Sequence, residues 1–210
     1  MADLATRSAK GSALTFLELD NNFTEIDRRT GSGWNDLVSD ITVRNGAGSA
    51  PDLVAFRDGI YAYGFTPDVL NECFANFHIR HDYIPGTMVY PHIHWTSNTT
   101  NTGVVRFGVE YTLARRGDST GLIAFGATST LYIEHNVATG EQYRHHVSET
   151  SDGNGIPGTN LEVDSMILCR IFRDAGHSND TFPDPAFMLT ADIHYQCDAQ
   201  STPLRSPPFF

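Results

Sequence analysis

Alternation of apolar and polar residues with a period of two is the feature that most constrains the fold of this chain. Residues 89–95 read VYPHIHW, and apolar side chains occupy every second position from 105 to 113. The same pattern recurs at Leu131 with Ile133 and again from 189 to 195. Successive side chains of a β-strand point to opposite faces, so this period gives each strand one apolar face. These segments therefore predict sheets with one buried face.

Loops rich in Gly, Asn, Asp, Ser and Pro separate these segments, at residues 97–103, 115–121, 151–159 and 174–185. We count about eight or nine strands, and that number at this spacing predicts a jelly-roll-like β-sandwich. Residues 166–173 begin with a continuous apolar run, which is typical of a central strand. The 210 residues suffice for one such domain and a small extra module.

Two local patterns predict further elements. Residues 53–65 fit two strands around the turn at residues 57–59, where Asp58 and Gly59 form the centre. Thr66 and Pro67 are typical of an N-cap and a first helical position, so we expect a brief helix as far as about residue 75.

The first 33 residues differ from the rest of the chain. Thr15 and Glu18 fit a capping box, which starts a helix by satisfying free backbone N–H groups. Phe16, Leu19, Phe23 and Ile26 then recur at steps of three and four, so they share one helix face. A helix of about three turns is marginal alone in water. This apolar stripe must therefore pack on its own domain, on its copies or on a partner.

Gly31-Ser32-Gly33 predicts the end of this helix and a hinge. We therefore divide the chain into an N-terminal docking arm (1–33) and a β-sandwich domain (34–210). The segment 201–210 contains three prolines and ends in two phenylalanines, which need an apolar seat at an interface or on the same subunit.

Charge and cysteine content exclude several classes. The formal charge is −11 and the chain has no basic stripe, so we expect no direct contact with nucleic acid. No secretory signal is visible, and no segment approaches the ~18 apolar residues of a membrane span. Cys73, Cys169 and Cys197 are odd in number and widely spaced, which predicts free, buried thiols.

The strongest chemical motif runs from Gly86 to His94 and resembles the Gly-x5-His-x-His start of the first cupin motif. Alternate strand residues point the same way, so His92 and His94 could bind one metal inside a barrel, with His194 as third ligand. The cupin glutamate is absent, however, because positions 98 and 99 are Asn and Thr. We therefore predict no metal, no cofactor and no enzymatic activity. These histidines are then expected on a polar face or at a subunit interface.

Other candidate residues are weaker. His135, His145 and His146 have no nucleophile beside them in sequence, and common hydrolase, deaminase and nucleotide-binding motifs are absent. Asp180 and Asp184 lack the spacing of an EF-hand, so we expect solvated loop carboxylates. Trp34, Tyr90 and Tyr143 could stack on sugars if they are exposed, although burial is the default for aromatic residues of sheets.

The N-terminal segment resembles the Lys-Gly-Ser-x-Leu-Thr-x-x-Glu-x-Asp-x-Asn-Phe sequence at the start of many bacteriophage tail-fibre and appendage proteins. The matching positions are Lys10, Gly11, Ser12, Leu14, Thr15, Glu18, Asp20, Asn22 and Phe23. Residues 90–95, 168–174 and 192–196 also look like a family of phage and prophage structural proteins, in which the paired histidines recur without the cupin glutamate.

These resemblances imply a virion structural protein, assembled in the host cytoplasm, that acts as a tail fibre or tail appendage. The expected partners are other virion proteins (tail, portal or adaptor, or capsid) and further copies in a homotrimer. The expected docking residues are Lys10, Gly11, Ser12, Leu14, Thr15, Phe16, Glu18, Leu19, Asp20, Phe23 and Ile26. The alternatives are a capsid cement or decoration protein, a head fibre, a carbohydrate-binding module, and a cupin-like metal-dependent enzyme.

Overall fold

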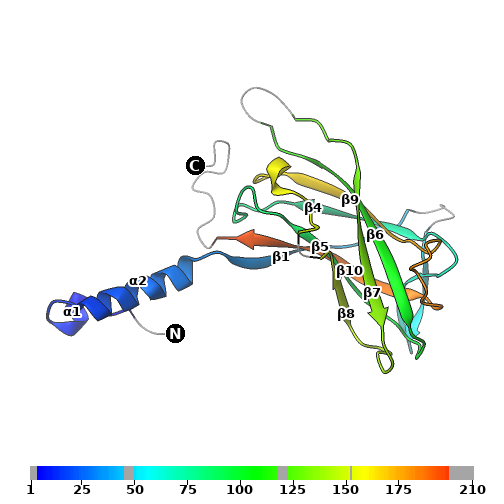
Figure 1. Ribbon diagram of the computed structural model, residues 1–210, viewed down its shortest axis with the longest axis horizontal. Coiled ribbons are helices and arrows are strands. Elements are labelled where there is room, and N and C mark those ends of the chain that lie inside the picture. The colour runs from blue at the N-terminus through cyan, green and yellow to red at the C-terminus, as the bar shows by residue number, and fades with distance from the viewer. Residues whose placement is uncertain (1–3, 45–49, 118–122, 152, 199–210) are drawn as a thin grey trace.

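The computed structural model describes residues 4–44, 50–117, 123–151 and 153–198. A helical arm, α1 (Arg7–Lys10) and α2 (Phe16–Thr30), precedes a domain built from strands (Figure 1). The strands are β1 (Gly33–Ser39), β2 (Asp52–Arg57), β3 (Ile60–Phe65), β4 (Glu72–His78), β5 (Tyr90–Thr96), β6 (Gly103–Ala114), β7 (Ser129–Val137), β8 (His146–Glu149), β9 (Met166–Arg173) and β10 (Ala186–Cys197). A short 3-10 helix, η1 (Gly158–Asn160), precedes β9.

The strands form two antiparallel sheets. One has the order β2-β3-β10-β5-β8, with β1 also paired to β10, and the other has the order β4-β9-β6-β7. If β3 is counted as strand 1 of a jelly roll and β10 as strand 8, the part β3-β10-β5-β8 of the first sheet has the order 1-8-3-6. The second sheet, β4-β9-β6-β7, then has the order 2-7-4-5. This is the double Greek-key order of an eight-stranded jelly roll. The predicted jelly-roll-like β-sandwich is therefore confirmed, and the segment 166–173 is an internal strand, as its apolar run indicates.

The core lies between the two sheets, where the alternating segments place their apolar residues. Ile93 and Trp95 of β5 face Phe107 of β6 and Ile133 of β7, and none of these side chains is more than 1% exposed. The indole Nε1 of Trp95 donates a hydrogen bond to Ser148 Oγ at 2.8 Å. The polar end of this core side chain is thus hydrogen-bonded rather than left unsatisfied.

Several local predictions hold. The segment 53–65 forms the hairpin of β2 and β3, with Asp58 in the left-handed region at the turn (φ 49°). Cys73 and Cys169 are buried free thiols, and Cys197 is a partly buried one. Burial raises the thiol pKa of both Cys73 and Cys169 to about 12, so these thiols stay protonated and unreactive. The terminal segment 201–210 lies outside the described residues.

The predicted helix after Pro67 is wrong. Residues 67–69 form a bend, and β4 follows from Glu72. The Asn71 side-chain oxygen accepts a hydrogen bond from the Thr66 backbone N–H at 2.7 Å, which closes a turn instead of starting a helix. The buried residues Cys73 and Phe77 then follow the period of a strand and pack in the core.

The predicted inward face of 189–195 is wrong at its first position. Leu189 is 44% exposed, whereas Ala191 and Ile193 are buried. The pairing of β10 with β5 shifts between Met188 and Thr190, which marks a β-bulge. The bulge changes the inward positions from even to odd numbers, and Leu189 falls at the change.

Arg173, at the end of β9, is fully buried and holds the loop that precedes β10. Its guanidinium binds the Asp180 carboxylate, with 2.7 Å between Nη2 and Oδ1 and 3.0 Å between Nε and Oδ2. Its Nη atoms also donate to the main-chain carbonyls of Phe65, Phe182 and Asp184. All five N–H donors are therefore used. The Asp180 side chain is 1% exposed, which corrects the expectation of a solvated carboxylate.

We expect Arg173→Met to lower the free energy of unfolding by about 3–5 kcal/mol, because it leaves the Asp180 carboxylate buried without a counter-charge. Urea unfolding followed by tryptophan fluorescence measures the change. Arg115→Met is the matched control, since Arg115 is exposed and its ion pair with Glu162 spans 4.0 Å. It should change stability by less than about 0.5 kcal/mol, and equal losses in both variants would contradict this role for Arg173.

Candidate functional site

The longer helix of the arm, α2, begins at the predicted capping box. Thr15 Oγ1 accepts from the Glu18 backbone N–H at 3.2 Å, and Glu18 Oε2 accepts from the Thr15 backbone N–H at 2.7 Å. Lys10 Nζ forms an ion pair with the same carboxylate. The hydrogen bond from Lys10, followed by those from Thr15, lowers the pKa of Glu18 to about 2. Lys10, Thr15 and Glu18 thus join the two helices of the arm.

The first helix folds back on the second. Gly11 ends α1 in the left-handed conformation (φ 72°), which favours glycine at this position. The Asn22 side chain clamps the chain before α1, accepting from Ala5 N at 2.8 Å and donating to Ala5 O at 2.7 Å. Much of the polar part of the phage-like segment therefore shapes the arm itself. Ser12 and Asp20 are exposed, and Leu14 is half-buried.

The apolar stripe of α2 is left open by the described part of the chain. Phe16 is 87% exposed and Phe23 is 68% exposed, while Leu19 and Ile26 are 37% and 42% exposed. Leu17, which the spacing did not single out, is 68% exposed. Figure 1 shows the arm extending away from the sandwich, joined to it through β1. A partner or another copy can therefore reach the stripe.

The second candidate site lies on the outer face of the six-stranded sheet. Ile93 and Ile193 face the core, so their neighbours along β5 and β10 point the opposite way. This places His92, His94 and His194 together, outside the sandwich. The cupin-like alternative, in which these histidines lie inside a barrel, does not fit this arrangement, because the alternation gives the interior to the apolar residues.

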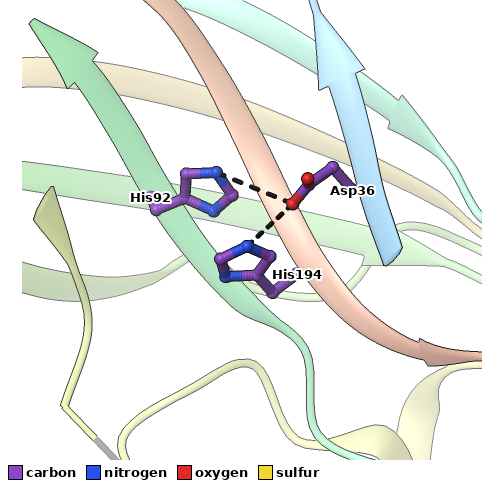
Figure 2. Close-up of side chains that lie close together, drawn as sticks. All are labelled: Asp36, His92 and His194. Atoms are coloured by element: carbon purple, nitrogen blue, oxygen red, sulfur yellow. Dashed lines mark ion pairs between the residues drawn. The ribbon is translucent and has the colours of Figure 1, made fainter. Parts of the chain in front are cut away.

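Asp36 of β1 joins His92 and His194 (Figure 2). His194 Nε2 lies 2.8 Å from Asp36 Oδ1, and His92 Nε2 lies 3.9 Å from the same oxygen. The two imidazole rings stack with centroids 4.1 Å apart. Two nitrogens thus converge on one carboxylate oxygen from adjacent strands.

Two further carboxylates surround these rings. Asp192 Oδ2 lies 3.7 Å from His92 Nε2 and 3.3 Å from His94 Nε2. Glu149 of β8 forms a hydrogen bond with His194 Nδ1 and lies 4.0 Å from His92 Nδ1. We call Asp36, His92, His94, Glu149, Asp192 and His194 the outer-face cluster.

Burial makes His92 the unusual member of the outer-face cluster. Its side chain is 2% exposed, and its Nδ1 is buried with no hydrogen-bond partner among the described residues. Burial, helped by the neighbouring His194 and His94, lowers the pKa of His92 to about 4. Burial also raises the pKa of Asp192. His92 is therefore a neutral imidazole at neutral pH, with a free electron pair.

Sequence reasoning found the three histidines and missed the three carboxylates. Along the chain, Asp36 is 56 residues from His92 and 156 from Asp192, and Glu149 is 43 residues from Asp192. Only the pairing of β10 with β1 and β5, and of β5 with β8, brings them together. The alternation around His194 predicts that Asp192 lies on the same side of the same strand as His194. It could not predict that Asp192 also lies beside His92, which belongs to another strand.

A shallow pocket of about 310 Å³ adjoins the outer-face cluster, lined by Trp34, Tyr90, Glu149 and His194. Trp34 is 56% exposed and its ring centroid lies 5.7 Å from that of Tyr90. Tyr143 lies elsewhere, against Phe56 with a centroid distance of 5.4 Å. Two of the three aromatic residues that could stack on a sugar thus share one pocket.

A smaller group of histidines lies at the edge of the core. His135 Nδ1 is 2.9 Å from Ser148 Oγ, which also accepts the Trp95 hydrogen bond. His146 is 6% exposed and packs against the Trp95 ring. Burial lowers the pKa of both His135 and His146. Ser148 and these rings form a packed polar layer.

No protein-family model matches the sequence, and no curated protein matches it. The structure is similar to the CBM22-1–GH10 modules of endo-1,4-beta-D-xylanase 10B from Clostridium thermocellum, with a TM-score of 0.34 and 15% identity. That match covers 78% of this chain and 26% of the xylanase chain, so this chain spans about a quarter of that protein.

A second structure is a carbohydrate-binding module, CBM28, specific for non-crystalline cellulose. Its TM-score is 0.27 and its identity 11%, over 75% of this chain and 86% of that chain. In the described part of the chain, no helix is long and apolar enough to cross a membrane.

We expect Thr15→Ala to weaken α2 by about 1 kcal/mol, because it removes the side-chain acceptor of the capping box. Hydrogen exchange of the α2 amides in the full chain measures this loss of protection. Thr24→Ala is the control, since Thr24 Oγ1 bonds only the Asp20 carbonyl within the helix. That substitution should leave protection unchanged or raise it, so an equal loss in both variants would contradict the capping role.

We expect His146 to make stability fall as pH falls below about 6.5. The unfolded histidine binds a proton near that pH, whereas burial lowers the folded pKa, so the unfolded state holds more protons in this window. Urea unfolding at pH 7 and pH 5 should show a smaller difference for His146→Gln than for the unchanged chain. His177→Gln, at an exposed position, should keep the full difference.

Proposed function

We propose that this chain is a structural protein of a bacteriophage virion, a tail fibre or tail appendage that docks through its N-terminal arm. The observation that carries the proposal is the apolar stripe of α2, which the described part of the chain leaves uncovered. Both helices of the arm are capped, yet Phe16 and Phe23 remain exposed. We infer that the arm is a folded surface that binds a partner. The resemblance of residues 10–23 to phage fibre proteins supports the same role.

The spacing of the stripe favours a homotrimer at the arm. Phe16 and Phe23 are seven residues apart, as are Leu19 and Ile26, which gives the a and d positions of two heptads. Three copies of α2 packed along this seam would cover the stripe, and the rest of the arm would contact the tail. In this proposal the sandwich is held outward and the protein acts by binding, without catalysis.

Quantitative mass spectrometry of purified particles, separated into tail and capsid fractions, tests the proposal. We expect this chain in the tail fraction at tens of copies per particle or fewer. Hundreds of copies on capsids would replace the tail assignment with a cement, decoration or head-fibre role. Absence of the chain from particles would overturn the virion proposal.

We expect the double substitution F16S/F23S to convert the trimer to a monomer and to prevent incorporation into particles, because it removes the most exposed apolar groups of the stripe. Analytical ultracentrifugation of the purified chain measures the first effect and mass spectrometry of particles the second. Ile60→Ser is the matched control, since Ile60 is 65% exposed on the β2–β3 hairpin, away from the arm. A trimer that survives F16S/F23S would contradict the proposed seam.

A further inference from the structure

We propose that the outer-face cluster binds one divalent transition-metal ion, with Asp36, His92 and His194 as protein ligands. The three residues come from β1, β5 and β10, and their donor atoms all lie within 4.8 Å of one another (Figure 2). This inference is independent of the virion proposal, because it rests on the sandwich and not on the arm.

The distances suit a metal centre. Ligand bonds of about 2.0–2.1 Å in a tetrahedral site place neighbouring donor atoms about 3.3–3.4 Å apart. The spacing from Asp36 Oδ1 is 2.8 Å to His194 Nε2 and 3.9 Å to His92 Nε2, which brackets that value. Each of these two spacings differs from that value by about half an ångström.

The state of His92 is the independent observation that points to a ligand. This ring is 2% exposed, and the carboxylate oxygens around it lie 3.7–4.0 Å away, beyond hydrogen-bond distance. No hydrogen bond among the described residues fixes this ring: its buried Nδ1 has no partner, and its Nε2 faces Asp36 Oδ1 at 3.9 Å. A buried polar ring without hydrogen bonds costs free energy, and coordination through Nε2 would give it one strong interaction.

The surroundings supply charge and orientation. Asp36, Glu149 and Asp192 bring three carboxylates to one patch, and a divalent cation would offset their mutual repulsion. Glu149 bonds His194 Nδ1, which fixes the ring so that Nε2 faces the site, as in carboxylate–histidine–metal arrangements. Asp192 lies close enough to His92 to supply an oxygen as a fourth ligand.

The donor set indicates the class of metal. Two imidazole nitrogens with carboxylate oxygens suit Zn²⁺, Fe²⁺, Co²⁺ or Ni²⁺, whereas Ca²⁺ prefers oxygen alone and Cu⁺ prefers sulfur. A bound ion would also tie β1 to β5 and β10, and β1 is the strand that continues from the arm. The site would thus reinforce the junction between arm and sandwich.

The test is calorimetric titration of the full-length, chelator-treated chain with Zn²⁺, together with Co²⁺ absorption spectroscopy. We expect one ion per chain and visible Co²⁺ bands typical of nitrogen and oxygen ligands. Asp36→Asn and His194→Gln should each weaken Zn²⁺ binding by about 10-fold or more, and Glu149→Gln by about 10-fold through loss of ring orientation. These variants should fold, because the Asp36 and His194 side chains are 51% and 35% exposed.

His135→Gln is the matched control, because His135 belongs to a separate group of possible ligands, with Glu141 and His146, that shares no residue with the outer-face cluster. It should leave Zn²⁺ affinity unchanged. Loss of binding in this variant, with binding retained in His194→Gln, would place the metal elsewhere and overturn the proposal. Binding that needs millimolar Zn²⁺, or that ignores all three cluster variants, would overturn it as well.

Discussion

The register of β10 is the constraint on which the rest of the structure depends. This strand pairs with β1, β3 and β5, so its alignment fixes where three other strands lie. A slip of one residue would exchange the core and outer faces of a strand. The bulge after Met188 shifts the register of β10 at one place. Beyond it, Ala191 and Ile193 face the core, while Asp192 and His194 lie on the outer face. One alignment thus sets both the packing and the outer-face cluster.

Much of the fold could be predicted from local patterns. A period of two identifies strands wherever one face is buried, and the capping box of α2 is a local hydrogen-bond exchange between Thr15 and Glu18. The two wrong predictions, the helix after Pro67 and the buried position of Leu189, have one physical origin. In both, pairing with a distant strand overrides the preference of the local sequence. Thr66 and Pro67 can start either a helix or a turn, and only the sheet that receives Phe77 decides between them. Leu189 is exposed because the pairing of β10 with β5 shifts at this residue, and the sequence around Leu189 does not indicate that shift.

The candidate site was predictable only in part, for the same reason. The alternation along residues 89–95 gave His92 and His94 a common side of one strand, opposite the apolar side that faces the core, but it could not show which residues of other strands lie beside them. Asp36 lies far from both in sequence, and its role arises only where β1 meets β10. More of the arm could be predicted from the sequence, because its contacts, such as that between Lys10 and Glu18, join residues that are close along the chain.

The path of the chain between the arm and the sandwich has a mechanical consequence. Only Gly31 and Ser32 separate α2 from β1, and Gly33 already pairs with Cys197 rather than serving as a hinge. A pull on the arm therefore acts along the axis of β1, in shear against its antiparallel neighbour β10. The hydrogen bonds of such a pair resist together instead of opening one after another. Tension on the arm is thus borne by β10, an inner strand of the six-stranded sheet.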